Sequence, residues 1–230
     1  MRSGLFEPAV RHGIESRLLN ALRGQPELMS PRTAQSPRAA GDALERLVAE
    51  LLEGALPRTC HTYSSSPSRR AMEDVSFLDE TGNYYAVDVK THRADTSFNM
   101  PNLTSVDRLA RFYQESSNFF CILLVRYAVV DARVDVSEVL FAPIEFLDWN
   151  SLTLGALGRG QLQIRRVDRL RLRPDLSREE WMLEFCEQVL RFYPRELVKI
   201  AQRIEQFERL RTQWAALVEA ARPAGQEDDE

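Results

Sequence analysis

The sequence predicts an α+β (α/β) fold in which a central mixed β-sheet is flanked by helices and a long helix lies near the C-terminus. Three observations support this prediction. Two segments with alternating apolar residues are joined by a turn, two longer apolar segments follow, and segments with helical periodicity lie on either side. The 230-residue chain is 44% hydrophobic and 28% charged, which is close to an average globular protein. This composition excludes collagen-like, mucin-like and wholly disordered classes.

Apolar residues at helical spacing predict five helical segments. The first is a short amphipathic stretch from Ile14 to Leu22. The second covers Gly41 to Leu56, and the third covers Leu103 to about Gln114. Two helices are predicted to close the chain: one begins at a capping box formed by Ser177 and Glu180, and a longer amphipathic one spans Leu197 to Trp214.

Strands are predicted where apolar residues alternate with polar ones or run together. The first two strands are separated by a segment rich in turn formers, which predicts a hairpin. The predicted strands are Met72–Asp79, Asn83–Thr91, Phe119–Val130, Val134–Phe141 and Gln161–Val167. A short helix and turn is predicted at Pro143–Leu154, followed by a glycine-rich loop at Gly155–Gly160.

Composition divides the chain into three parts. Residues 1–39 are expected to be an N-terminal arm and linker, because a segment rich in Pro, Ser and Arg follows the first amphipathic stretch. Residues 40–220 are expected to form one domain, and 221–230 a disordered acidic tail. The net charge of −4 reflects 34 acidic and 30 basic residues, and four of the acidic ones are the last four residues. Without them the body is neutral, so its charge does not exclude a nucleic-acid partner.

Neither membrane insertion nor secretion is expected. The longest apolar run, Phe119 to Val125, has seven residues, whereas about 20 are needed to span a bilayer. A signal-peptide pattern is not apparent. The three cysteines, Cys60, Cys121 and Cys186, are odd in number and far apart. They predict a protein of the reducing cytoplasm rather than a disulfide framework or a zinc site.

Two aspartates and a lysine are predicted to share one face of the hairpin. Apolar and polar residues alternate along both strands, so one face is apolar and the other carries Asp74, Asp88 and Lys90. Lys90 is one of only two lysines among the 30 basic residues, the other being Lys199. This bias indicates a position at which an ammonium group is needed.

These residue types suit Mg²⁺-dependent hydrolysis of a phosphodiester. The carboxylates of Asp74 and Asp88 and the backbone carbonyl of Val89 are hard oxygen ligands for Mg²⁺. The ammonium group of Lys90 can stabilise the attacking hydroxide and the developing charge, which the broad guanidinium of arginine does less well. Glu45 borders the buried face of the helix upstream. The alternative is a solvated hairpin face on which Asp88 and Lys90 form a weak surface pair.

The order of helical Glu, hairpin Asp and Asp-x-Lys resembles the PD-(D/E)xK nuclease superfamily. Its details resemble the blunt-cutting type II restriction endonucleases of the HincII and EcoRV branch. Ala39–Val48 is similar to their opening helix, and Asp88–Thr91 (Asp-Val-Lys-Thr) to their catalytic strand. Asn99–Asn102 (Asn-Met-Pro-Asn) is similar to the loop that enters the DNA groove, and Arg178–Trp181 to the start of the penultimate helix. The resemblance runs discontinuously from about residue 39 to 210.

The resemblance implies a restriction-endonuclease-like core and assigns roles to individual residues. Asp74 and Asp88 would be metal ligands and Lys90 the catalytic lysine, with Glu45 supporting them from the helix. Thr91 would fix the end of the catalytic strand beside the scissile phosphate.

Further residues are implied to contact DNA. Asn102 would bind a base edge, and Asn99 or Met100 would wedge into the base stack. The segment from Gly155 to Gln163 would read the major groove. Within this segment, three residues are selected on chemistry: Arg159, Gln161 and Gln163. Arginine reads guanine and glutamine reads adenine in the major groove.

The sequence therefore leads to one main hypothesis, a Mg²⁺-dependent homodimeric endonuclease that cuts both strands of a short palindromic site in double-stranded DNA. It would act in a prokaryotic cytoplasm beside a DNA methyltransferase specific for the same site. Two alternatives stay open: a repair or junction-resolving nuclease of the same superfamily, and a DNA-binding module that no longer holds metal.

Overall fold

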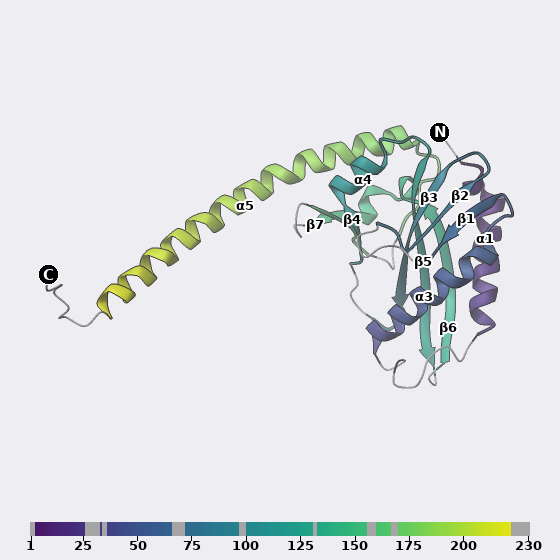
Figure 1. Cartoon of the computed structure of the whole chain (residues 1–230), viewed down its shortest axis with the longest axis horizontal. Coiled ribbons are helices and arrows are strands. Elements are labelled where there is room, and N and C mark those ends of the chain that lie inside the picture. Colours follow the sequence, from purple (N-terminus) through teal and green to yellow (C-terminus); the bar gives the residue numbers. More distant parts are fainter. Residues whose placement is uncertain are drawn as a thin grey trace, which may run out of the picture. The chain divides into compact units, whose positions relative to one another are not determined.

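The computed structural model of the chain describes residues 3–25, 33, 36–65, 72–96, 100–130, 133–155, 160–166 and 170–221. The chain divides into two compact units, Met1–Phe185 and Cys186–Glu230. The helices and strands, labelled as in Figure 1, are η1 (Gly4–Phe6), α1 (Pro8–Arg23), α3 (Pro37–Ala55), β1 (Cys60–Ser64), β2 (Val75–Asp79), β3 (Tyr84–Arg93), β4 (Asn102–Ser105), α4 (Val106–Phe112), β5 (Asn118–Val130), β6 (Arg133–Pro143), η2 (Ile144–Phe146), η3 (Trp149–Ser151), β7 (Leu152–Gly155), β8 (Gln161–Ile164) and α5 (Arg178–Ala220).

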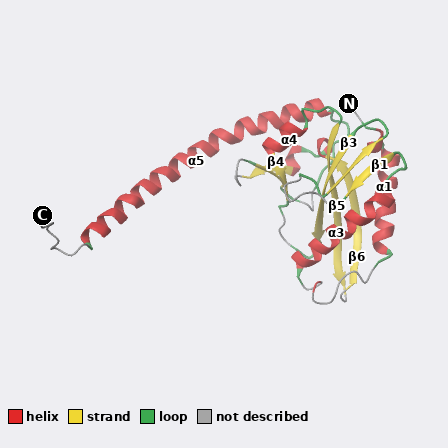
Figure 2. Ribbon diagram, viewed as in Figure 1, coloured by secondary structure: helices red, strands yellow, loops and turns green. Residues whose placement is uncertain are grey.

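A five-stranded sheet lies at the centre of the first unit (Figure 2), and its strand order is β1-β2-β3-β5-β6. β3 and β5 are parallel, and the other neighbouring pairs are antiparallel. Strand β5 is buried on both faces from Phe119 to Val125, which explains its continuous apolar run. The predicted α+β class with a mixed central sheet is confirmed.

Helices α1 and α3 pack on this sheet (Figure 1): α1 contacts β6 and α3, and α3 contacts β3. Ile14, Leu18 and Leu22 of α1 are buried in the same core as Val87 and Val89 of β3. The apolar face of α1 is thus covered, as an amphipathic helix requires. Residues 3–23 were expected to be part of an arm, but their buried apolar side chains, which include Leu5 and Phe6, belong to the core of the first unit.

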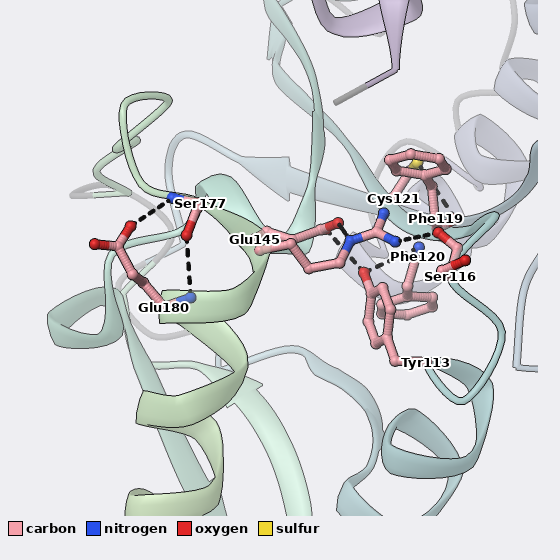
Figure 3. Close-up of polar contacts among 9 residues, drawn as sticks. Tyr113, Ser116, Phe119, Phe120, Cys121, Glu145, Ser177 and Glu180 are labelled. Atoms are coloured by element: carbon pink, nitrogen blue, oxygen red, sulfur yellow. Dashed lines mark hydrogen bonds and ion pairs between the residues drawn. The ribbon is translucent and has the colours of Figure 1, made fainter. Parts of the chain in front are cut away.

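A buried polar cluster holds the first turn of α5 within the first unit. Arg178 Nε donates to Glu145 Oε1 over 2.7 Å, and the hydroxyl of Tyr113 donates to Glu145 Oε2 over 2.8 Å. Figure 3 shows Tyr113 and Glu145 meeting within this cluster. The guanidinium also donates to the carbonyl of Ser116 over 2.6 Å and lies 4.1 Å from the ring centre of Phe119. Burial raises the pKa of Glu145 and the charge of Arg178 opposes that shift.

Helix α5 begins at the predicted capping box. The Ser177 amide donates to Glu180 Oε2 over 2.9 Å, and the Glu180 amide donates to Ser177 Oγ over 3.1 Å (Figure 3). The prediction of two closing helices is wrong, because α5 is one helix of 43 residues that contains Pro194. Proline removes a single backbone hydrogen bond, and the long helical segments on both sides keep the helix continuous.

Other predicted boundaries also differ from the structure. Helix α3 begins at Pro37 rather than Gly41, because the Ser36 side chain caps it by accepting from the Ala39 amide. Helix α4 begins after Ser105, which caps it by accepting from the Arg108 amide, so it does not start at Leu103. The last predicted strand ends at Ile164 instead of Val167. Within the described residues, no helix combines the length and apolar character needed to cross a membrane.

Candidate active site

The candidate site is built on the β2–β3 hairpin, whose turn is fixed by Asp79. Asp79 Oδ1 accepts from the amides of Thr81 and Asn83, and its Oδ2 accepts from the hydroxyl of Tyr85 over 2.6 Å. Burial raises the pKa of Asp79, but these hydrogen bonds outweigh it and lower the pKa to about 2. Val75 lies opposite Val87 in the resulting antiparallel register. The predicted hairpin is confirmed.

Asp74 lies just before β2 and is bound to β3 through both its backbone and its side chain. Its amide donates to the carbonyl of Val87 over 2.9 Å, and its Oδ2 accepts from the amide of Val89 over 2.7 Å. The second bond holds the carboxylate beside the part of β3 that carries Asp88 and Lys90. The expectation that these three residues come together is confirmed.

Asp88 is the most deeply buried acidic residue of the hairpin face. It is 5% exposed, and its Oδ1 accepts from Lys90 Nζ over 2.7 Å. Its Oδ2 is also buried but has no hydrogen-bond partner among the described residues. Burial raises the pKa of Asp88 to about 7; Lys90 lowers it, whereas the nearby charge of Asp74 raises it further.

Lys90 is held as a cation by the surrounding carboxylates. Burial lowers its pKa, but the charges of Asp88, Asp74 and Glu45 together raise it above the ordinary value. The side chain is 19% exposed and lines a cavity. In this environment Lys90 can supply positive charge, whereas its deprotonation is disfavoured.

Glu45 approaches the same residues from helix α3. Burial raises its pKa, Lys90 lowers it, and the charge of Asp74 raises it further. Its Oε1 accepts from the hydroxyl of Thr91 over 3.4 Å. A Cβ atom at Gly41 would lie 3.0 Å from that hydroxyl oxygen, so the absence of a side chain at Gly41 lets α3 approach β3 closely. The predicted position of Glu45 at the border of the buried face is confirmed.

A cavity of about 380 Å³ opens beside these residues. Glu45, Lys90 and Thr91 line it together with Pro101, which comes just before β4. Arg38 and Tyr127 also line this cavity but were not predicted. Tyr127 comes from the far end of β5, and only the parallel pairing of β3 with β5 brings it here.

The donor atoms fit a partly hydrated Mg²⁺ ion. Among the described residues, no group of three or more His, Cys, Asp or Glu could hold a metal by itself. Mg²⁺ commonly binds only one or two carboxylates and keeps several waters. The buried Oδ2 of Asp88 has no hydrogen-bond donor among the described residues, and the Asp74 carboxylate is held at the amide of the next residue, Val89. The Val87 carbonyl accepts from the Asp74 amide. Because alternate residues direct their carbonyls to the same side of a strand, the Val89 carbonyl also lies on the side of Asp74.

Three of the predicted base-reading residues, Asn102, Gln161 and Gln163, lie in a second, antiparallel sheet with the order β4-β8-β7. Asn102 of β4 lies opposite Gln163 of β8, and Gln163 Nε2 donates to Asn102 Oδ1 over 2.6 Å. Gln161 and Gln163 alternate with the buried Leu162 and therefore share one face, as predicted. A Cβ atom at Gly155 would lie 2.5 Å from Gln163 Oε1, so a larger residue there would displace the end of the Gln163 side chain.

The remaining predicted contacts are only partly described. Met100 is half-buried and lies just before Pro101, which lines the cavity. Asn99 and Arg159 lie outside the described residues.

A comparison of the chain with models of known protein families finds no match, and a comparison with curated proteins also finds none.

Proposed function

We propose that this protein is a type II restriction endonuclease of the PD-(D/E)xK superfamily, from the branch of HincII and EcoRV. It hydrolyses phosphodiester bonds in both strands of a short palindromic site in double-stranded DNA, depends on Mg²⁺, and leaves blunt ends with 5′-phosphates. One observation carries the proposal: Asp74, Asp88 and Lys90 gather on one hairpin, where a buried carboxylate oxygen of Asp88 lacks a donor.

Each residue has a role in this reaction. Asp74, Asp88 and the Val89 carbonyl would hold Mg²⁺, which when bound supplies positive charge to the phosphate and acidifies a water. Lys90 remains cationic and stabilises the negative charge that develops as water attacks the phosphorus in line. The 2.7 Å ion pair with Asp88 orients its ammonium group before DNA binds.

Residues outside the metal site position and read the DNA. Glu45 and Thr91 fix the end of β3 through their hydrogen bond. The amide groups of Asn102, Gln161 and Gln163 contact base edges, since amides pair with adenine in the major groove. Arg159, Asn99 and Met100 are assigned to DNA contacts on resemblance and chemistry.

The proposed assembly is a homodimer, because cutting both strands of a palindrome requires two sites related by a two-fold axis. A restriction enzyme of this kind acts in the cytoplasm of a prokaryote, where a DNA methyltransferase of the same specificity protects the host DNA.

The experiment is digestion of unmethylated phage DNA by the purified chain with Mg²⁺, and with EDTA as the control. Discrete bands that require Mg²⁺ are the expected result. A smear would instead favour a repair or junction-resolving nuclease, and intact DNA under all metal conditions would contradict nuclease activity.

A further inference from the structure

The second compact unit contains one helical segment with a strongly apolar stripe. From Leu197 to Ala221 every described side chain is exposed within the chain. Three large examples are Ile204, Phe207 and Trp214, which are 55%, 64% and 60% exposed. Continuous apolar surface of this kind marks a site of association.

This stripe repeats every seven residues. In heptad notation, position a is occupied by Leu190, Leu197, Ile204, Arg211 and Val218, and position d by Cys186, Tyr193, Ile200, Phe207, Trp214 and Ala221. The repeat extends over the 36 residues from Cys186 to Ala221, about five heptads, and Arg211 is its charged member. A sustained seven-residue repeat is typical of a left-handed coiled coil, because the stripe of a straight helix drifts against it.

The helix surface is hollowed along the same stripe. A groove of about 390 Å³ is lined by Ile200, Ile204 and Phe207, with Arg203 on one flank and Glu208 on the other. Coiled coils pack by inserting a side chain of one helix into such a hollow on its partner.

We propose that α5 forms a parallel, in-register, two-stranded coiled coil with α5 of a second copy of this chain. This inference rests on the homodimer of the proposed function, and it identifies α5 as the surface through which that dimer assembles.

Charges beside the stripe specify the parallel orientation. Arg203 occupies position g and Glu208 position e of the next heptad. In a parallel pair, position g of one chain faces position e of the following heptad in the other. Arg203 of each copy therefore faces Glu208 of the other copy, which gives two such pairs in the dimer. In an antiparallel pair, g faces g and e faces e, and this match is lost. Glu196, another g residue, already pairs with Lys199 of its own helix over 2.6 Å.

Arg211 specifies the register. It is the charged residue among the a positions, where a polar side chain fixes the alignment of two helices at some cost in stability. In register, the two Arg211 side chains lie at the same level and extend together toward solvent. A shift by one heptad would place each against Ile204 or Val218 and desolvate the charge.

The test is the mass of the full-length chain in solution, measured by light scattering over a concentration series without DNA or metal. The mass of two chains is expected. Ile204→Glu should raise the dimer dissociation constant by about 100-fold, because it places a charge in the apolar interface. The matched control is Val198→Glu: Val198 is 58% exposed but occupies position b outside the stripe, so its variant should remain a dimer.

Charge exchange tests the orientation. Arg203→Glu and Glu208→Arg should each weaken the dimer by about tenfold, and the double variant should restore it. A double variant no tighter than the single variants would overturn the parallel pairing. A monomer, a trimer or a tetramer of the wild-type chain would overturn the two-stranded coil. A dimer that survives Ile204→Glu would overturn the coiled coil. It would leave the proposed nuclease activity intact, because the cleavage assay tests that activity separately.

Discussion

The side-chain amide of Gln163 donates to the side-chain oxygen of Asn102 over 2.6 Å, although the two residues are 61 positions apart. The bond links β8 to β4, the strand that follows the cavity-lining Pro101. It orients two amide groups side by side, one of them on the residue directly after Pro101. The pair can therefore present a defined pattern of donors and acceptors to DNA.

Replacing Gln163 should damage recognition more than folding. Gln163→Ala removes the proposed base contact and the hydrogen bond that orients Asn102, and a lost amide–base pair costs about 1–3 kcal/mol. We expect the wild-type band pattern to require about 10- to 100-fold more enzyme, with an unchanged melting temperature. The control is Gln114→Ala at an exposed position after α4. Unaltered cleavage by Gln163→Ala would remove this residue from recognition.

The two lysines of the chain allow a matched test of catalysis. Lys90→Ala should lower the cleavage rate at least about 100-fold, since groups that stabilise transition-state charge contribute at this scale. Lys90→Arg should not restore the rate, because guanidinium cannot occupy the compact position of the ammonium group. Lys199→Ala, at an exposed helix position, should cleave like the wild type. Retained cleavage by Lys90→Ala would contradict the role of Lys90.

The burial of Asp88 should make stability depend on pH. Its pKa is about 7 in the folded chain but about 3.9 when unfolded. The folded state therefore holds a proton that the unfolded state has released, and stability from this group falls as pH rises from about 4 to 7. Asp88→Asn has no such titrating group and should not lose this stability. The difference between its melting temperature and that of the wild type should therefore increase from about pH 4 to pH 7.

The same variant should lose its response to metal. Mg²⁺ is expected to raise the melting temperature of the wild-type chain at pH 8, because a ligand that binds only the folded state stabilises it, and to leave that of Asp88→Asn unchanged. Asp135→Asn, at an exposed position on β6, is the control for both measurements. Equal pH dependence of the melting temperature for the wild type and Asp88→Asn would show that the pKa of Asp88 is not raised in the folded chain.

Two glycines of α3 test the close approach of this helix to β3. A Cβ at Gly54 would contact nothing within 4 Å, so Gly54→Ala should stabilise the chain by about 0.5–1 kcal/mol. Gly41→Ala should give less, because its Cβ would lie 3.0 Å from Thr91 Oγ1. In the Thr91→Ala background, Gly41→Ala should recover the full gain in the free energy of unfolding, measured in a double-mutant cycle of denaturant unfolding. Equal gains at both glycines, without coupling to Thr91, would contradict this contact.

Local patterns predicted the hairpin and the capping box, because strand alternation, turn residues and caps act over a few positions. Asp74, Asp88 and Lys90 came together as expected, since one hairpin carries all three. Glu45 was placed correctly because helical spacing defines the buried face of α3.

Tertiary packing decided what local patterns could not. The core position of α1 depends on β6, which is more than a hundred residues away in sequence, so its short apolar stretch resembled part of an arm. The pairing of Asn102 with Gln163 and the position of Tyr127 depend on strand order. The continuity of α5 through Pro194 reflects the helical preference of long flanking segments, which outweighs one missing hydrogen bond.

Asp74, Asp88 and the Val89 carbonyl are proposed to hold a divalent ion beside Lys90. Anomalous X-ray scattering from crystals soaked in Mn²⁺ tests it most directly. We predict one strong peak within bonding distance of oxygens from Asp74 and Asp88, absent in Asp88→Asn crystals. Well-diffracting wild-type crystals with no peak there, or with the ion bound elsewhere on the chain, would contradict the claim.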